Sequence, residues 1–234
     1  MLNIIKVFIK SLTHKKISYS YGGVDLLILD IFKNQKKGYY LDIGCAHPIK
    51  NNNTYLLYKK GWNGINIDLD KENIDLFNSY RKKDFNVSVA VSGKEGEADL
   101  YFYHNKSALN TISKKNAEFQ KAKVSAIKKI KTQTINKIIE NSPFNDRKID
   151  FLSVDVEGSE LDIFKNLDFN KYSPKVIVVE FLDLSLKKLE IKNLNINNMI
   201  RSEIFELIQS KGYTLANVLH SDLIFIRNSF RDES

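Results

Sequence analysis

Short apolar runs alternate with stretches of helical periodicity along most of the chain. We predict strands at seven runs that are rich in β-branched and aromatic residues and bounded by turn residues: 39–43, 64–68, 86–91, 151–155, 176–181, 213–219 and 223–227. Apolar residues recur at helical spacing, and predict helices, over 24–33, 54–60, 71–80, 159–166 and 199–211. This alternation is typical of an α/β fold with a mostly parallel seven-stranded sheet and helices on both faces.

The last two predicted strands are separated by only three residues, which predicts a C-terminal antiparallel hairpin. Residues 98–103 alternate like a further strand, and 130–140 read as a short strand that runs into a helix. The stretch between them is polar, basic and weakly periodic, and no Pro/Gly/Ser linker flanks it. We interpret residues 104–130 as a basic insertion near the site, within one domain that spans 37–234 and follows an N-terminal helical segment, 1–36.

The first twelve residues carry an apolar stripe at helical spacing, with lysines elsewhere on the helix. Such a pattern suits a helix on a membrane surface, and it equally suits a first helix packed on its own domain, which we favour. The lysines argue against a signal peptide, and no apolar run approaches the roughly 20 residues that span a bilayer. We therefore expect a cytoplasmic protein, with peripheral membrane contact through residues 1–16 as the alternative.

The composition, 43% apolar and 27% charged, excludes collagen, low complexity and wholesale disorder. The formal net charge of +8 is unevenly placed, because residues 104–148 hold 11 basic and 3 acidic side chains. A basic segment fits nucleic-acid phosphates, an anionic membrane surface, or an acidic or diphosphate-linked substrate. A solvated helix face explains the same pattern without any ligand.

A turn follows the first predicted strand, with Asp42 and Gly44 at the strand's end and His47 in the loop. Ligands of open α/β sheets bind beyond the carboxyl ends of the strands, where a glycine lets the backbone approach them. Asp42 could hold an amino group or orient the loop, and we favour a turn-stabilising role for His47. The later glycines of a dinucleotide-binding loop are missing, which disfavours an NAD-linked oxidoreductase. A ligand-free tight turn would use the same residues, and Cys45 is interpreted as a small packing residue.

Carboxylates also close three later predicted strands. Asp68 could accept both hydroxyls of a ribose, although a helix N-cap, shared with Asp70, is the alternative. Asp155 and Glu157 could hold a cation, raise each other's pKa or act as a base. The alternative is that Glu157 and Glu160 complement a helix N-terminus. Glu180 could bind a substrate hydroxyl. If carboxylates from two strand ends converge, a divalent metal could bind there. The sequence does not show whether they converge, so the metal content is unknown from the sequence alone.

Two segments carry a family resemblance, GYYLDIGCAHPIKNNNTYLLYKKGWNGINIDLD from Gly38 and IDFLSVDVEGSELDIFKNLDF from Ile149. Together with the strand that ends at Phe181, they resemble the FkbM-type family of S-adenosylmethionine-dependent methyltransferases. The likeness runs from about residue 19 to 181, but 19–25 match the family's entry motif only loosely. It implies a class I methyltransferase (Rossmann-like) fold with S-adenosylmethionine held over the carboxyl ends of the first strands.

Position by position, the resemblance implies a set of cofactor contacts. The methionine end would lie along Asp42, Gly44, Ala46 and His47, with Asp68 at the ribose. The adenine would lie beside Ala90, Val91 and Ser92, and Asp155 and Glu157 would lie near the methionine amine and the acceptor.

Members of this family mostly methylate hydroxyls, often on sugars of glycolipids, polysaccharides or natural products. The resemblance therefore implies an O-methyltransferase that acts on a glycan or a sugar-containing metabolite. An anionic or lipid-linked acceptor is one form of this hypothesis. Asp155 and Glu157 are the predicted catalytic bases, with Glu180 behind them. The alternative from another class is a nucleic-acid-binding protein that uses 106–148, although this segment lacks regularly interleaved aromatic residues.

Overall fold

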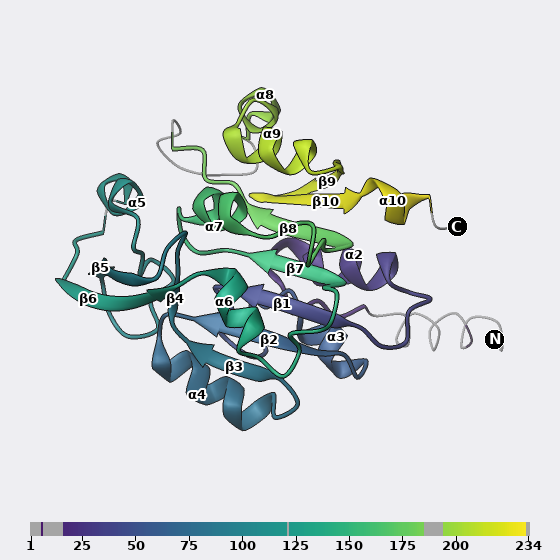
Figure 1. Ribbon diagram of the computed structural model, residues 1–234, viewed down its shortest axis with the longest axis horizontal. Coiled ribbons are helices and arrows are strands. Elements are labelled where there is room, and N and C mark those ends of the chain that lie inside the picture. The colour runs from purple at the N-terminus through teal and green to yellow at the C-terminus, as the bar shows by residue number, and fades with distance from the viewer. Residues whose placement is uncertain (1–5, 7–15, 121, 185–193, 233–234) are drawn as a thin grey trace.

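The computed structural model describes residues 6, 16–120, 122–184 and 194–232. Its main sheet has the strand order β3-β2-β1-β7-β8-β10-β9. The strands are β1 (Tyr39–Ile43), β2 (Asn63–Asp68), β3 (Phe85–Ser88), β7 (Phe151–Val154), β8 (Val176–Glu180), β9 (Tyr213–Leu219) and β10 (Asp222–Arg227). The first five run parallel, and β10 runs antiparallel to both of its neighbours. The predicted seven-stranded α/β fold with a C-terminal hairpin is thus confirmed (Figure 1).

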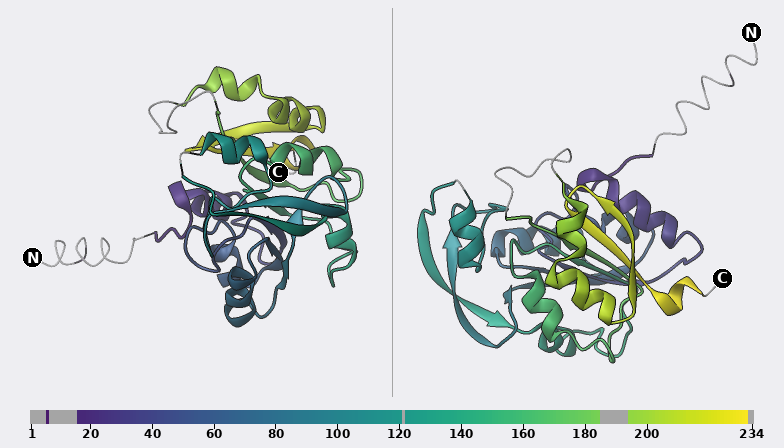
Figure 2. Two further views of the ribbon diagram at one scale, coloured as in Figure 1. Left: turned by 90° about the vertical axis from the view of Figure 1, so that its left-hand side faces the viewer. Right: turned by 90° about the horizontal axis from the view of Figure 1, so that it is seen from above.

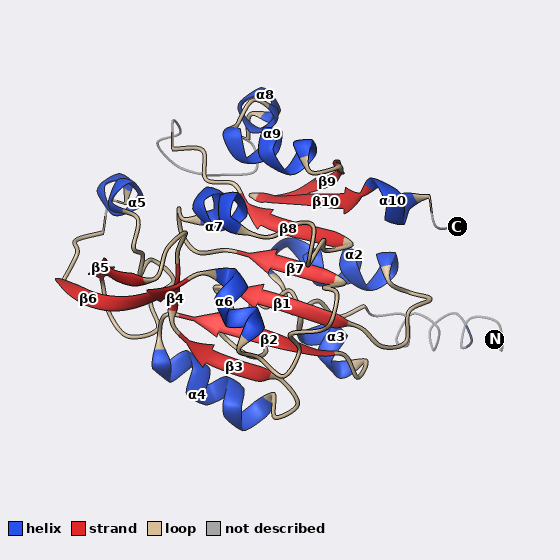
Figure 3. Ribbon diagram, in the orientation of Figure 1, coloured by secondary structure: helices blue, strands red, loops and turns tan. Residues whose placement is uncertain are grey.

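Helices cover both faces of this sheet because successive strand residues point to opposite sides. On one face, α6 (Ile135–Glu140), α7 (Glu160–Asn166) and α9 (Glu203–Ser210) share a core with Leu41 and Leu152. On the other face, α2 (Val24–Ile31) and α3 (Tyr55–Lys59) share a core with Tyr40 and Phe151. Figure 3 shows α6 in front of the sheet and α2 behind it. The remaining helical elements are η1 (Tyr21–Gly23), α4 (Lys71–Tyr80), which packs on β2 and β3, α5 (Lys114–Phe119), α8 (Ile196–Ile200) and α10 (Asn228–Arg231).

A second, three-stranded sheet is formed by β4 (Ala90–Val91), β6 (Ala126–Gln133) and β5 (Gly96–Phe102), in the order β4-β6-β5. With α5 it lies beyond the carboxyl ends of the parallel strands (Figures 1 and 2). The predicted strand 86–91 is therefore two strands in two sheets. Its last two residues, Ala90 and Val91, pair with Thr132 and Gln133 of β6, which lie 42 positions downstream, just after the predicted insertion.

The predicted helix 199–211 is also divided, into α8 and α9. Ser202 lies between them with extended backbone, and its side chain accepts a hydrogen bond from the backbone N–H of Phe205. A serine in this conformation begins a new helix, because it satisfies a backbone donor that the first turn leaves unpaired.

The N-terminal region joins the main domain through α2, whose Val24 and Ile28 are fully buried against the sheet. The predicted amphipathic stretch at 1–12 lies outside the described residues, apart from Lys6. The division at residue 36 stays a prediction. Within the described part of the chain, no helix is both long and apolar enough to cross a membrane.

Candidate functional site

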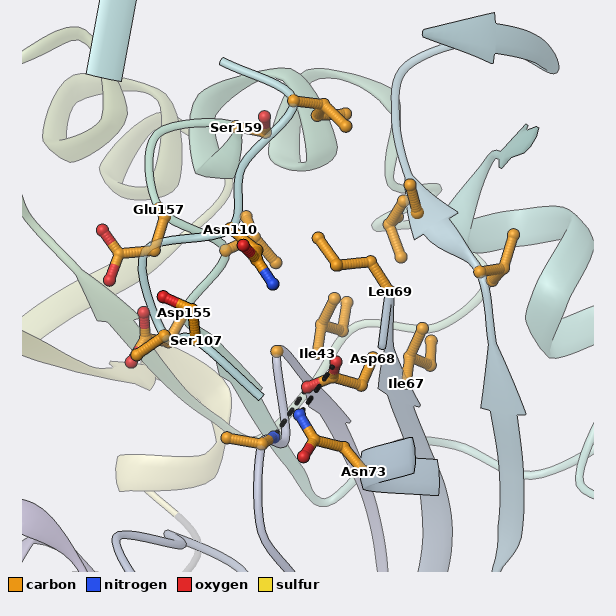
Figure 4. Close-up of a pocket in the computed structure, with 18 of the residues that line it drawn as sticks. Ile43, Ile67, Asp68, Leu69, Asn73, Ser107, Asn110, Asp155, Glu157 and Ser159 are labelled. Atoms are coloured by element: carbon orange, nitrogen blue, oxygen red, sulfur yellow. Dashed lines mark hydrogen bonds between the residues drawn. The ribbon is translucent and has the colours of Figure 1, made fainter. Parts of the chain in front are cut away.

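A cavity of about 220 Å³ opens over the carboxyl ends of β1, β2 and β7 (Figure 4). Eight of the predicted site residues line it: Gly44, Ala46, His47, Asp68, Ala90, Val91, Asp155 and Glu157. Three others, Asp42, Ser92 and Glu180, are not part of its lining. Parallel strands deliver their carboxyl ends to one edge of a sheet, which is why residues so distant in sequence meet here.

The loop after β1 is fixed by Gly44, which has a φ of +80°. A Cβ at this position would overlap the backbone carbonyl oxygen of Asp155, so only glycine lets the two loops touch. The backbone N–H groups of Gly44 and Cys45 donate to the carbonyl of Ile67, at 2.9 and 3.1 Å. Cys45 itself is buried beside Ile74 and Phe77.

The other loop residues show how the turn is held. Ala46 has a φ of +49°, an uncommon conformation for a residue with a side chain. The Nδ1 atom of His47 accepts hydrogen bonds from the N–H groups of Ile49 and Lys50, at 3.1 and 3.0 Å. His47 therefore stabilises the turn, while burial and nearby lysines lower the pKa of its imidazole.

Asp42 is buried next to the loop and is not part of the cavity lining. Its Oδ2 accepts hydrogen bonds from Asn52 Nδ2, at 3.0 Å, and Thr54 Oγ1, at 2.8 Å. Burial raises the pKa of its carboxyl to about 6, although Arg81 acts in the opposite direction. Because Asn52 also donates to the carbonyl of Cys45, this geometry favours the loop-orienting role for Asp42.

Asp68 is held so that its carboxylate faces the cavity. Ala46 N–H donates to Oδ2 at 2.9 Å, while Asp70 N–H and Asn73 Nδ2 donate to Oδ1, at 2.7 and 3.3 Å (Figure 4). The N-cap of α4 is Asp70, which accepts from Glu72 N–H at 2.9 Å. Burial raises the pKa of Asp68, and its hydrogen-bond donors oppose that shift.

Carboxylates from two strand ends do converge. One oxygen of each of Asp155, Glu157 and Glu180 lies within 4.8 Å of the others. Burial is the main cause that raises the pKa of each, to about 7 for Glu157, and the Asp155 charge raises the pKa values of Glu157 and Glu180 further.

Glu157 is placed by the insertion. It has a φ of +59°, and its carbonyl accepts hydrogen bonds from Thr111 Oγ1, at 2.8 Å, and Asn116 Nδ2, at 2.6 Å. Asn116 Nδ2 also donates to Oε2 of Glu157 at 3.1 Å. Glu160, the first residue of α7, accepts hydrogen bonds from the N–H groups of Val156 and Gly158, so its carboxylate holds the loop that precedes this helix.

Of the three residues predicted to lie beside the adenine, the structure places two in the cavity lining. Ala90 and Val91 line the cavity with Val89, whereas Ser92 lies beside it. The N–H of Ser92 donates to the carbonyl of Gln133 at 3.0 Å, which continues the pairing of β4 with β6.

Sequence reasoning missed two contributions to this site. Asp222 begins β10 directly opposite Glu180, and burial together with the Asp155 charge raises the pKa of its carboxyl to about 7. Its position in the sequence, as an acidic residue directly after the hairpin turn, could have identified it. The second contribution is the segment 106–112, from which Lys106, Ser107, Ala108, Asn110 and Ile112 line the cavity. Its weak periodicity gave no indication of which residues face inward.

The basic charge of the insertion is partly neutralised by local ion pairs. Lys129 Nζ lies 2.6 Å from Asp99, Lys106 Nζ lies 3.4 Å from Glu72, and Lys114 Nζ lies 3.7 Å from Glu118. These lysines are mostly exposed, so each pair is weak, but together they reduce the field that a polyanion would meet.

The sheet with its single antiparallel strand, and the cavity over the carboxyl ends of its first strands, define the class I methyltransferase fold. The family model described as the methyltransferase FkbM domain matches residues 42–215. The chain therefore belongs to the FkbM family of S-adenosylmethionine-dependent methyltransferases.

Among solved structures, the chain is similar to a TehB-like SAM-dependent methyltransferase from Corynebacterium glutamicum ATCC 13032 Kitasato. The two share 13% sequence identity with a TM-score of 0.40, over 96% of each chain. No curated protein matches the chain.

Proposed function

We propose that this methyltransferase transfers the methyl group to a hydroxyl of a sugar, a glycan or a sugar-containing metabolite. The observation that carries the proposal is a group of carboxylates, of which Asp155 and Glu157 line the cavity and Glu180 lies next to these two. A sugar hydroxyl is a weak nucleophile at neutral pH, and a base beside it contributes about 10²- to 10⁴-fold to the rate.

The residues of the cavity fit S-adenosylmethionine. The carboxylate of Asp68 is fixed by three donors, and its free lone pairs suit the ribose hydroxyls. The apolar walls beside it, from Ile67, Leu69, Ala90 and Val91, suit an adenine ring. The tight loop at Gly44 and Ala46 suits the methionine end. When bound, the cofactor supplies an electrophilic methyl group on a sulfonium. The bond from sulfur to the methyl carbon breaks during transfer, and the demethylated cofactor leaves as a neutral thioether.

The protein's part in the reaction is alignment and proton acceptance. As the acceptor oxygen forms its bond to the methyl carbon, its proton passes to a carboxylate of Asp155 or Glu157. A pKa of about 7 suits Glu157 to this step, because a base is most effective when its pKa lies near the working pH. Glu180 lies behind these two and would orient them or a neighbouring hydroxyl.

The acceptor is proposed to be small or glycan-like, and anionic or lipid-linked in one variant, because Lys106 lines the cavity. We propose a cytoplasmic location, with residues 1–16 as the segment that would contact a membrane. Nucleic acid is the weaker alternative, because several lysines of the basic segment already pair with carboxylates.

Isothermal titration with S-adenosylhomocysteine tests the cofactor site. We expect the wild-type protein to bind, and Asp68→Asn to bind at least about tenfold more weakly, because charge-assisted hydrogen bonds are lost. The matched control is Asp99→Asn, an exposed carboxylate on β5, which leaves affinity unchanged. A wild-type protein that binds no S-adenosylhomocysteine would overturn the cofactor assignment.

Methyl transfer to sugar acceptors tests the reaction itself. Product analysis should find the methyl group on a hydroxyl oxygen. Asp155→Asn and Glu157→Gln should each lower the rate by about 10²-fold or more. Because Asp155 is also a predicted cofactor contact, Glu157→Gln is the variant in which we expect nearly unchanged S-adenosylhomocysteine affinity. Transfer to nitrogen, or unchanged rates in both variants, would contradict the proposal.

A further inference from the structure

The carboxylate cluster Asp155, Glu157 and Glu180 lacks partners that would compensate its charge. None of the ion pairs among the described residues includes any of the three. Asp222 and Glu160 add further acidic groups nearby, since each of them interacts electrostatically with Asp155. Like charges held this close repel, and the repulsion persists unless protons or a cation neutralise it.

Glu180 is the member that points most clearly to a missing ligand. Its Oε2 is buried, and no donor from the described part of the chain makes a hydrogen bond to it. Its Oε1 accepts a long hydrogen bond, 3.4 Å, from Ser221 Oγ, and the other group against its carboxyl is the acidic side chain of Asp155. A buried polar atom without a partner costs about 1–3 kcal/mol, so such atoms call for an unseen partner.

Neighbouring carboxylates in the same site are treated differently. Asp68 accepts three hydrogen bonds from N–H groups, and Glu160 accepts from two backbone N–H groups of its own loop. The carboxylates that hold the loops of this site, Asp68 and Glu160, are therefore each satisfied by N–H donors. From residues outside it, the cluster receives the Asn116 amide, on Glu157, and the distant Ser221 hydroxyl, while Asp155 and Glu180 share a hydrogen bond that needs a proton between the two carboxyl groups.

The backbone is also arranged to aim Glu157 into the cluster. A non-glycine residue at a φ of +59° is strained, and strained residues persist only where the surroundings fix them. Thr111 and Asn116 provide that fixation through the Glu157 carbonyl. Figure 4 shows Asp155 and Glu157 on the same side of the cavity.

The spacing of the oxygens suits a hard divalent cation. In a six-coordinate site, oxygens on opposite sides of the ion lie about 4.2 Å apart for Mg²⁺ and about 4.6–5.2 Å apart for Ca²⁺. The three ligand oxygens lie within 4.8 Å of one another, so they could surround such an ion with small side-chain movements. An all-oxygen donor set selects Mg²⁺, Mn²⁺ or Ca²⁺ over softer metals.

We propose that Asp155, Glu157 and Glu180 bind one hard divalent cation, whose open coordination positions face the cavity and take adjacent hydroxyls of the acceptor. Asp155 and Glu157 line the cavity, whereas Glu180 is not part of its lining and has a buried Oε2. Two neighbouring hydroxyls would bind as a chelate, which favours acceptors with a vicinal diol. The proton of the reacting hydroxyl would pass to the oxygen of Asp155 or Glu157 that does not ligate the ion, since each residue offers one oxygen as ligand. This assignment of the acceptor rests on the proposed function, whereas cation binding itself does not.

Titration of the metal-free protein with Mn²⁺, followed by the electron paramagnetic resonance signal of the free ion, tests the site. We expect about one Mn²⁺ per chain, displaced by excess Mg²⁺ or Ca²⁺. Asp155→Asn and Glu180→Gln should each weaken Mn²⁺ binding at least about tenfold. Asp99→Asn, with its carboxylate on β5, is the matched control and should bind Mn²⁺ like the wild type.

Each outcome decides the matter. Wild-type protein that binds no Mn²⁺ at millimolar concentration, or variants that bind it as well as the wild type, would overturn the proposal. If Glu180→Gln proves unfolded by circular dichroism, the exposed Asp155→Asn variant carries the test. S-adenosylhomocysteine titration of the same samples separates the two proposals, since cofactor binding without Mn²⁺ binding overturns only the cation site.

Discussion

Gly44 illustrates how one residue couples two loops of the site. It has a φ of +80°, and an added Cβ would overlap the Asp155 carbonyl, whereas Gly61 has a φ of +92° and open space around it. Gly61→Ala should therefore cost only the backbone strain, about 1–2 kcal/mol. We expect Gly44→Ala to lower the free energy of unfolding by at least about 2 kcal/mol more, and to weaken S-adenosylhomocysteine binding. Urea unfolding and calorimetry measure both, and equal effects of the two substitutions would contradict this account.

Asp42 predicts a pH dependence of stability. Burial raises the pKa of its carboxyl from 3.8 to about 6 in the folded protein. Between these values the folded state keeps a proton that the unfolded state has released, so this group's stabilising contribution is lost as the pH rises from about 4 to about 6. Asp42→Asn, which retains an oxygen acceptor, should reduce that decline by about 2–3 kcal/mol. Urea unfolding at pH 4 and pH 7 tests this, with Asp99→Asn as control; an unchanged slope in Asp42→Asn would refute it.

At the scale of elements, the segment 104–112 is attached to the start of α4. Asn105 Nδ2 donates to Glu72 Oε1 at 2.6 Å, and Lys106 N–H donates to Asp70 Oδ2 at 2.6 Å. Lys106 Nζ also pairs with Glu72 Oε2 at 3.4 Å. These contacts hold over the cavity a segment that has no regular secondary structure of its own.

Removing this attachment should loosen the segment without unfolding α4. We expect Glu72→Ala to weaken S-adenosylhomocysteine binding about two- to fivefold, because half-exposed ion pairs contribute up to about 1 kcal/mol. Proteolysis within 104–112 should become faster as well. Asp75→Ala lies on the same helix and removes only an exposed pair with Lys71, so it should change neither property. An equal response of the two variants would show that helix stability, not the attachment, is responsible.

The elements that the sequence predicted well are those whose pattern is local. All five residues of β1 are buried, so their apolar run marks a central strand without any knowledge of its neighbours. The run 86–91 also has the pattern of a strand, but its division between two sheets depends on pairing with Thr132, which no local pattern encodes. The break at Ser202 was readable in principle, as a capping residue within a helical pattern.

The site follows the same rule. Asp68, Asp155 and Glu180 were found because carboxyl ends of parallel strands share one edge, a rule that needs only strand positions. The position of the Asp42 carboxylate depends on hydrogen bonds from Asn52 and Thr54, and that of the Glu157 carboxylate depends on a hydrogen bond from Asn116. These are side-chain contacts between segments, and a sequence reveals them only after the loops are placed.

For the whole molecule, Arg81 is a residue that joins several segments distant in sequence. Its guanidinium is fully buried and pairs with Asp84, at 2.9 Å. It also donates to Tyr40 OH of β1, at 2.8 Å, and Thr54 Oγ1, at 2.8 Å, while Asn52 Oδ1 accepts at 3.1 Å. This network therefore joins the end of α4, the middle of the sheet and the loop that borders the cavity.

Arg81→Met should consequently destabilise the entire fold, not just one element. Removing one partner of a buried ion pair costs about 3–5 kcal/mol, because Asp84 stays buried without its counter-charge. In thermal unfolding this corresponds to a melting temperature lower by about 6–20 °C for a chain of this size. Lys71→Met removes an exposed ion pair at the other end of the same helix and should change stability by less than about 0.5 kcal/mol. Weaker S-adenosylhomocysteine binding by fully folded Arg81→Met protein would show that Arg81 also positions the cavity loop, through Asn52 and Thr54. Unchanged affinity of the folded variant would show that the network contributes to stability alone.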